Sequence, residues 1–235
     1  MIYFVTGTDT DSGKTLVSSA LLHLASQLRH QDDSPWQTLG IKPVASGCEQ
    51  TAEGLRNSDA LALQAQSSVQ LDYRQVNPFS FTPAIAPHIV AAQEGVDISP
   101  EALHAALDIP RYQETDFTLI EGAGGWRLPL GNQRMMPELV QTLQLPVILV
   151  VGMKLGCLNH AVLTQEAILA DGLQITGWVA NQVDGEMQYV AENLAELTEL
   201  MSAPCLGVIP HLASPQVDVA SEYLTLPHLL RHNGK

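Results

Sequence analysis

Basic side chains are scarce in this sequence. Lysine and arginine together number 11, against 25 aspartate and glutamate residues, so the formal net charge is −14 at pH 7. A protein with so few positive charges lacks the broad positive field that attracts a polyanion. Nucleic acid is therefore not expected as a partner.

Cysteine and long hydrophobic runs are also scarce. Three cysteines, Cys48, Cys157 and Cys205, form neither a CxxC pair nor an even set, which fits a reducing compartment. The longest apolar run, residues 145–153, falls far short of the roughly 20 residues that cross a bilayer. The first residues lack the basic segment of a signal peptide. We therefore expect a cytoplasmic protein with no membrane partner.

The sequence does have enough apolar material for a full core. Hydrophobic residues make up 46% of the 235 residues and charged residues 15%, which argues against disorder. No internal repeat, low-complexity tract or Pro/Gly/Ser linker divides the chain. A single domain over residues 1–235 is the simplest expectation.

Short β-branched apolar runs alternate with segments of helical period, which predicts an α/β fold with a parallel sheet and crossover helices. Ser58 and Ser99 are interpreted as helix N-caps. Residues 67–87, with Pro78, Pro83 and Pro87, are interpreted as a surface loop in preference to an excursion near the functional site. Strands are expected at residues 2–6, 38–42, 117–121, 146–151, 175–181 and 205–209, and helices at 14–29, 58–64, from 100, 159–170 and 187–200.

A glycine-rich loop joins the first expected strand to the first expected helix. It begins at Gly7 and ends in Gly13-Lys14-Thr15. Glycines let backbone N–H groups turn toward a phosphate, lysine meets the outer phosphates, and the threonine hydroxyl can bind Mg²⁺. Five residues separate Gly7 from Gly13 where the usual motif has four, but the strand, loop and helix context favours a nucleotide site over an ordinary glycine turn.

Carboxylates at other strand and helix ends are candidate metal ligands, because Mg²⁺ prefers oxygen. Glu121 ends an apolar run and precedes Gly122-Ala123-Gly124-Gly125, which is interpreted as a flexible loop. Asp59 lies at a helix N-terminus, where it could cap the helix, bind the metal, or do both. The chain has four lysines, and Lys14, Lys42 and Lys154 each follow an apolar run beside small or turn-forming residues, whereas Lys235 ends the chain.

The segments FVTGTDTDSGKT, KPVASG, GLRNSDAL, EGAGGW, LPVILVVGMKLGCLNHA and GWVAN resemble the dethiobiotin synthetase family, from residue 3 to about residue 212. The five-residue spacing of the phosphate loop is that family's variant. The resemblance implies a three-layer P-loop NTPase-like fold, with a mostly parallel central sheet and helices on both faces. It also implies a homodimer that uses ATP and Mg²⁺ to close a cyclic urea from 7,8-diaminononanoate and CO2 in biotin biosynthesis.

The family's reaction brings two anions together. One amine captures CO2 as a carbamate, ATP phosphorylates it to a carbamic-phosphoric anhydride, and the second amine displaces phosphate to give dethiobiotin. Two like unit charges at 4 Å repel by about 4 kcal/mol at an effective dielectric of 20. Positive groups are therefore needed between the carbamate and the γ-phosphate.

The resemblance assigns roles to individual residues. Lys42 matches the catalytic lysine, Lys14 the lysine that holds the β- and γ-phosphates, Thr10 a loop residue that faces the carbamate, and Ser46 a substrate contact. Thr15, Asp59 and Glu121 match the Mg²⁺ ligands. Nucleotide contacts match Asp11, Ser12, Gly13, Lys14, Thr15, Leu16, Asp59, Glu121, Gly122, Ala123, Gly124, the adenine-reading Asn181 with Gln182 beside it, and Pro210, His211 and Leu212.

The segment Gly156, Cys157, Leu158 and Asn159 opens a helix whose free N–H groups, in the family, receive the substrate's distal carboxylate across the dimer interface. Cys157 is interpreted as a small buried thiol in preference to an activated nucleophile. Lys154 is expected to secure either the dimer or the active-site loop.

Departures from the family pattern leave alternatives open. Asp11-Ser12 stands where the family often has Glu-Val, and Gln216 where a glutamate is common. A paralogue that acts on another diamine or amino acid would show the same motifs. A ParA/MinD-like switch ATPase is disfavoured, because residues 8–12 contain no lysine and the tail 226–235 offers neither a basic face nor a membrane-seeking helix.

Overall fold

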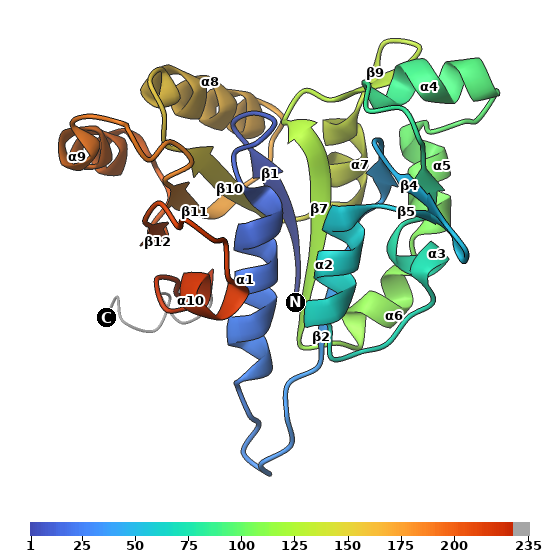
Figure 1. Cartoon of the computed structure of the whole chain (residues 1–235), viewed down its shortest axis with the longest axis horizontal. Coiled ribbons are helices and arrows are strands. Elements are labelled where there is room, and N and C mark those ends of the chain that lie inside the picture. Colours follow the sequence, from blue (N-terminus) through green and yellow to red (C-terminus); the bar gives the residue numbers. More distant parts are fainter. Residues whose placement is uncertain (228–235) are drawn as a thin grey trace.

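Six parallel strands form the central sheet, in the order β12-β11-β10-β1-β7-β2 (Figure 1). The protein is described by a computed structural model that covers residues 1–227. The expected α/β class and all six expected strands are confirmed. The strands are β1 (Ile2–Gly7), β2 (Thr38–Ile41), β7 (Phe117–Gly125), β10 (Val147–Gly152), β11 (Ile175–Asn181) and β12 (Cys205–Ile209).

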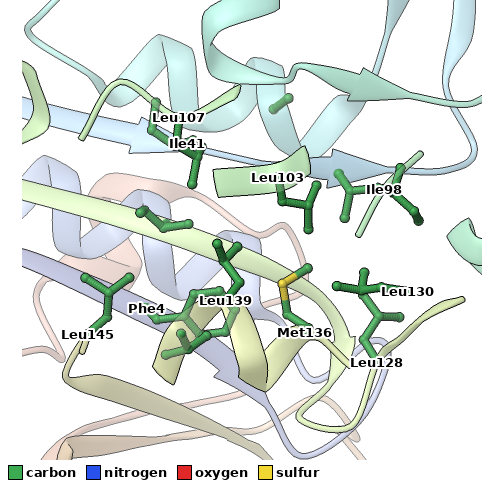
Figure 2. Close-up of a cluster of buried hydrophobic side chains, with 14 of the residues drawn as sticks. Phe4, Ile41, Ile98, Leu103, Leu107, Leu128, Leu130, Met136, Leu139 and Leu145 are labelled. Carbon is green, nitrogen blue, oxygen red and sulfur yellow. The ribbon is translucent and has the colours of Figure 1, made fainter. Parts of the chain in front are cut away.

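Helices cover both faces of this sheet. Alternate residues of β1 point to opposite faces, as the pleat of a strand requires. Tyr3 and Val5 pack in one cluster with apolar residues of α1 (Lys14–Ser26) and α10 (Val217–Ser221). Phe4 packs on the other face with Leu139 of α7 (Met136–Leu143) and Leu103 of α5 (Pro100–Ala106) (Figure 2). The expected layers of helix, sheet and helix are therefore present.

The remaining elements complete the two helical layers and add small strand pairs near the carboxyl ends of the large strands (Figure 1). The helices are α2 (Ser58–Gln66), α3 (Tyr73–Val76), α4 (Pro87–Glu94), α6 (Ile109–Gln113), α8 (Cys157–Ala170) and α9 (Val190–Leu200). The strand pairs are β3 (Val44–Ala45) with β6 (Phe79–Ser80), β4 (Glu49–Thr51) with β5 (Gly54–Arg56), and β8 (Pro129–Gly131) with β9 (Arg134–Met135).

One of the two expected helix caps is confirmed. The Ser99 hydroxyl accepts a hydrogen bond from Ala102 N at 3.2 Å and caps α5. Ser58 is not a cap, because Asn57 fills that role and its side chain accepts from Ala60 N at 3.1 Å. Asparagine and serine cap helices about equally well, so the sequence alone left a one-residue ambiguity at this end.

The interpretation of residues 67–87 as a surface loop is wrong. Tyr73, Val76 and Phe81 are buried in the core, and the segment folds into α3 and β6. Val76 O accepts a hydrogen bond from Lys42 N at 2.8 Å, so the segment lies directly against the end of β2. The three prolines suggested an irregular exposed stretch, whereas the apolar residues between them cover the core.

The glycine segment after Glu121 is not a free loop, because β7 continues to Gly125 and Gly125 pairs with Gly7 of β1. The register shifts between Val5 and Gly7, where the phosphate loop leaves the sheet. Among residues 1–227, no helix is both long and apolar enough to span a bilayer. The tail for which neither a basic face nor a membrane-seeking helix was expected falls largely at residues 228–235, outside the described residues, as does Lys235.

Gly207 tests how tightly β12 is held by the chain that follows α10. A Cβ at Gly207 would overlap Tyr223 O, where Thr225 N also donates to Leu206 O at 2.7 Å. We expect Gly207→Ala to lower the free energy of unfolding by about 2–3 kcal/mol, because backbone must move to make room. The control is Gly95→Ala, which has open space but a left-handed φ of 68° and should cost about 1 kcal/mol. Equal losses in urea unfolding would contradict this packing.

Candidate functional site

The glycine-rich loop runs from the end of β1 to the start of α1. Gly13 has a φ of 83°, and a Cβ there would overlap the side-chain amide of Asn181, so this position requires glycine. The loop directs the N-terminus of α1, with its partial positive charge, toward the cavity described below. Lys14 is buried, and its Nζ donates to Asp9 O across the loop at 3.1 Å.

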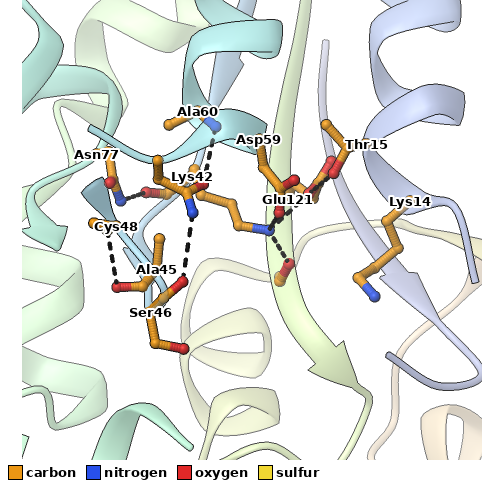
Figure 3. A network of polar contacts seen from close by, with 12 residues as sticks. Lys14, Thr15, Lys42, Ala45, Ser46, Cys48, Asp59, Ala60, Asn77 and Glu121 are labelled. Carbon is orange, nitrogen blue, oxygen red and sulfur yellow. Dashed lines mark hydrogen bonds and ion pairs between the residues drawn. The ribbon is translucent and has the colours of Figure 1, made fainter. Parts of the chain in front are cut away.

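Four side chains from four separate segments of the chain meet beside this loop and form what we call the charge cluster: Thr15, Lys42, Asp59 and Glu121 (Figure 3). Lys42 Nζ lies 2.7 Å from Glu121 Oε1 and 3.0 Å from Asp59 Oδ2. The Thr15 hydroxyl donates to the same Glu121 Oε1 at 2.9 Å. Lys42 directly follows β2, and Glu121 lies within β7, so neighbouring parallel strands deliver both groups to one edge of the sheet.

Burial makes the pairing in the charge cluster obligatory. Glu121 is 0% exposed and Lys42 is 3% exposed, and an isolated buried charge is far more costly than a paired one. Burial alone would lower the pKa of Lys42, but Glu121 and Asp59 hold that pKa above its usual value. Burial alone would raise the pKa of Asp59, but the charge and hydrogen bond of Lys42, with a hydrogen bond from Thr15, hold it below its usual value.

Lys14 differs from Lys42 in its partners. Burial, together with the positive charge of Lys42, lowers the pKa of Lys14. The Lys14 amine contacts the backbone carbonyl of Asp9. The Lys42 amine contacts the carbonyl of Gly122 and, in addition, two carboxylates (Figure 3). Lys14 is therefore the less compensated of the two cations, and an incoming anion would stabilise its charged form.

The oxygen atoms of the charge cluster fit a divalent cation. Glu121 Oε2 is buried and has no hydrogen-bond partner among the described residues, although Oε1 has two. Within residues 1–227 no group of three or more His, Cys, Asp or Glu side chains could hold a metal alone. Two carboxylates and a hydroxyl suit Mg²⁺, which binds through few protein ligands and completes its shell with water and substrate phosphates.

A cavity of about 370 Å³ opens beside the charge cluster. It brings together ten of the residues expected from the sequence, namely Thr10, Asp11, Gly13, Lys14, Thr15, Lys42, Ser46, Asp59, Ala123 and Gly124. The lining also contains Ala45 and Asn57, which the sequence analysis missed. For Asn57 the available signal was its place directly before a helix, where a capping side chain is common.

The residues expected to contact the base lie outside this cavity lining. Asn181 is buried, and its Nδ2 donates to Ser12 O at 3.0 Å, so it supports the phosphate loop. Gln182 N donates to Ile209 O at 2.9 Å, which joins the ends of β11 and β12. Pro210, His211 and Leu212 follow β12 on that side, and Gln216 precedes α10 as its N-cap.

The start of α8 lies apart from the charge cluster, and its first residues are not lining residues of the cavity. Gly156 is the N-cap with a φ of 92°, and Cys157 is buried. The N–H of Cys157 already donates to Lys154 O at 3.0 Å, so the expectation of a free N–H is wrong for this residue.

Lys154 binds the phosphate loop. Its Nζ lies 3.0 Å from Asp9 Oδ2, and this hydrogen bond holds the pKa of Asp9 below its usual value. Of the two expected roles for Lys154, this contact matches the one that secures the active-site loop.

Comparison with known proteins adds sequence relatives. A family profile described as an AAA domain matches residues 2–216. The ATP-dependent dethiobiotin synthetase BioD of Cellvibrio japonicus (strain Ueda107) is 54% identical over 228 residues, which are 97% of this chain and 97% of the relative. The ATP-dependent dethiobiotin synthetase BioD 1 of Escherichia coli (strain K12) is 50% identical and covers 95% of this chain and 97% of the relative.

Solved structures that resemble this chain are more distant. A ParA family ATPase from Chlorobium tepidum TLS aligns with a TM-score of 0.53 at 13% identity, over 90% of this chain and 85% of that chain. A chain of the MinC:MinD cell division protein complex from Aquifex aeolicus gives 0.55 at 15% identity, over 99% and 89%. At such low identity the likeness shows the P-loop NTPase fold alone.

The pairing in the charge cluster can be tested without any ligand. We expect Lys42→Met to lower the free energy of unfolding in urea by about 3–5 kcal/mol, because Glu121 would be left buried without a partner charge. Adding Glu121→Gln should restore most of the loss, since it removes the uncompensated carboxylate. Arg29→Met is the control, because its ion pair with Asp33 is exposed and should contribute less than about 1 kcal/mol. If Lys42→Met and Arg29→Met lowered the free energy of unfolding equally, the pairing would be contradicted.

Proposed function

This chain belongs to the dethiobiotin synthetase family of ATP-dependent ligases, and from that premise we propose that it joins CO2 to 7,8-diaminononanoate and closes the ring of dethiobiotin. The reaction consumes ATP, passes through a carbamate and a carbamic-phosphoric anhydride, and releases ADP and phosphate. The observation that carries the proposal is the approach of Lys42 to two carboxylates beside the phosphate loop, in a cavity that Lys14 also lines.

Charge control is the physical demand of this chemistry. An anionic carbamate must approach an anionic γ-phosphate, and repulsion at contact distance would slow the step severely. Lys14 would hold the β- and γ-phosphates, and Lys42 would bridge the carbamate and the transferring phosphoryl group. Because its pKa is raised, Lys42 stays protonated at neutral pH and serves as a fixed positive charge and hydrogen-bond donor, with no role as a base.

Thr15, Asp59 and Glu121 would hold Mg²⁺. The ion supplies neutralisation of the phosphate oxygens when it is bound with ATP. Thr10 and Ser46 line the same cavity and are proposed to face the carbamate and the substrate. The backbone from Asp11 to Leu16 and from Gly122 to Gly124 would surround the phosphates.

The adenine base would lie on the far side of the phosphate loop from Lys42. Asn181 ends β11 there with Gln182 directly after it, and residues 210–212 follow β12. In the ligand-free protein one N–H of the Asn181 amide donates to Ser12 O, which leaves its second N–H and its oxygen for base recognition.

The distal carboxylate of the substrate is proposed to bind the start of α8, from Gly156 to Asn159, on the partner subunit of a homodimer. A helix N-terminus favours an anion. Leu155 is 97% exposed and Leu163 is 55% exposed, so α8 and the turn before it present apolar side chains suited to a subunit contact.

The reaction itself gives the first test. Purified protein supplied with 7,8-diaminononanoate, bicarbonate, Mg²⁺ and ATP should form a product of the mass of dethiobiotin, with one ADP for each ring closed. Omission of bicarbonate or addition of EDTA should abolish product. ATP hydrolysis without ring closure would reject the proposal and favour a paralogue with another amine substrate or a switch ATPase.

Lys42 gives the second test. Lys42→Met should reduce turnover by about 10²-fold or more, as expected for loss of one transition-state donor. ATP binding, measured by calorimetry at a temperature where the variant is folded, should persist because Lys14 and the loop are unchanged. Arg29→Met should leave turnover near the wild-type value. Wild-type turnover in the Lys42→Met protein would remove this lysine from the mechanism.

A further inference from the structure

Tyr73 places a hydroxyl group between the start of the helix that carries Asp59 and Asn77, a residue that contacts the backbone of Lys42. The tyrosine is 9% exposed and lies in α3, in the segment that the sequence suggested was a surface loop. Its hydroxyl accepts from Asn57 N at 2.7 Å. It also donates to Asn77 Oδ1 at 3.0 Å. Both bonds are buried, so the hydroxyl is fixed in position and direction.

Asn77 continues this connection to Lys42. The asparagine is 1% exposed, and its Nδ2 donates to Lys42 O at 2.7 Å. Lys42 N donates to Val76 O at 2.8 Å, so the backbone of Lys42 is held on both sides by residues of one short segment. Lys42 follows the last residue of β2 and has no further ladder to fix it within that strand.

Asn57 continues the connection to Asp59. Asn57 is the N-cap of α2, and Asp59 lies in the first turn of that helix. The Tyr73 hydroxyl holds the backbone N–H of the cap residue, and thereby fixes where the helix begins. Asp59 then reaches Lys42 Nζ at 3.0 Å.

These contacts close into a ring. From Lys42 Nζ the path runs to Asp59, back along the chain to Asn57, across the Tyr73 hydroxyl to Asn77, and returns to the carbonyl of Lys42. A closed path of short bonds restricts the separation of the charged groups more strongly than either element could alone. Arg56 lies over the aromatic ring of Tyr73 with its guanidinium carbon 4.3 Å from the centroid, which further fixes the tyrosine side chain.

We propose that Tyr73 and Asn77 are positioning residues for the phosphoryl-transfer step, because their ring of hydrogen bonds sets the distance between the Lys42 amine and the Asp59 carboxylate. This inference rests on the proposed function of Lys42. Displacement of a catalytic group by 1 Å can cost about 10²-fold in rate, so loss of one bond of the ring should be visible in turnover.

Tyr73→Phe removes the hydroxyl and keeps the aromatic ring against Arg56. We expect kcat to fall about tenfold, because Asn57 and Asn77 lose their common partner and the closed path of hydrogen bonds opens. The KM for ATP should change less than twofold, since the phosphate loop is untouched. Tyr112→Phe is the matched control: it removes a hydroxyl from another buried tyrosine, in α6 outside the ring, and should leave kcat unchanged. Equal kcat values for the two variants and the wild type would overturn the proposal.

A second measurement separates this proposal from the proposed function. Thermal unfolding of nucleotide-free protein can be compared for Tyr73→Phe, Lys42→Met and the double variant, with no use of catalysis. If the ring couples the two residues, the double variant should melt higher than the sum of the single shifts predicts. Simple additivity would overturn the proposal even in an active enzyme. If Tyr73 and Lys42 are coupled in stability but the protein makes no dethiobiotin, the hydrogen-bonded path between them stands and the proposed function is rejected.

Discussion

The fully buried carboxylate of Glu121 is the constraint on which the site depends. A buried charge persists only with a partner, and Lys42 supplies it at 2.7 Å. Lys42 must therefore leave β2 toward β7, and Asp59 must approach from α2 to share the same amine. Thr15, which follows the phosphate loop in α1, donates a hydrogen bond to the same Glu121 Oε1. One buried group thus fixes the mutual positions of three others.

The parallel sheet makes this convergence possible. Strands β1, β7 and β2 are neighbours and run in the same direction, so their carboxyl ends open at one edge. The phosphate loop leaves β1 there, and β7 passes it with a shift of register. The other side of the loop rests on β10 and β11, through Thr8 N to Val150 O at 2.9 Å and through Asn181. The loop is consequently held from both sides before any ligand binds.

Sequence reasoning reached the sheet and most of the cavity lining because both have local signals. A β-branched run predicts its strand without knowledge of its neighbours, and Gly13-Lys14-Thr15 carries its chemistry within three residues. The support of the site had no such signal. Tyr73 and Asn77 are polar or aromatic residues among prolines, and only tertiary contacts show that they hold Lys42. The Asp9 to Lys154 ion pair likewise joins residues 145 positions apart.

The charges of the ligand-free site bear on how its ligands can enter. Lys14 and Lys42 lie near Asp59 and Glu121, and Asp11 also lines the cavity, so carboxylates outnumber lysines there by three to two. A triphosphate alone would be drawn to the lysines but repelled by the carboxylates, and a divalent cation alone would meet the Lys42 amine between its own ligands. When the triphosphate and the cation bind together, they cancel much of each other's charge. The cation offsets the carboxylates that repel the triphosphate, and the triphosphate offsets the lysines that repel the cation. Under the proposed function, Asp59 and Glu121 would then hold the cation beside the Lys42 amine, whose fixed positive charge would face an anionic substrate.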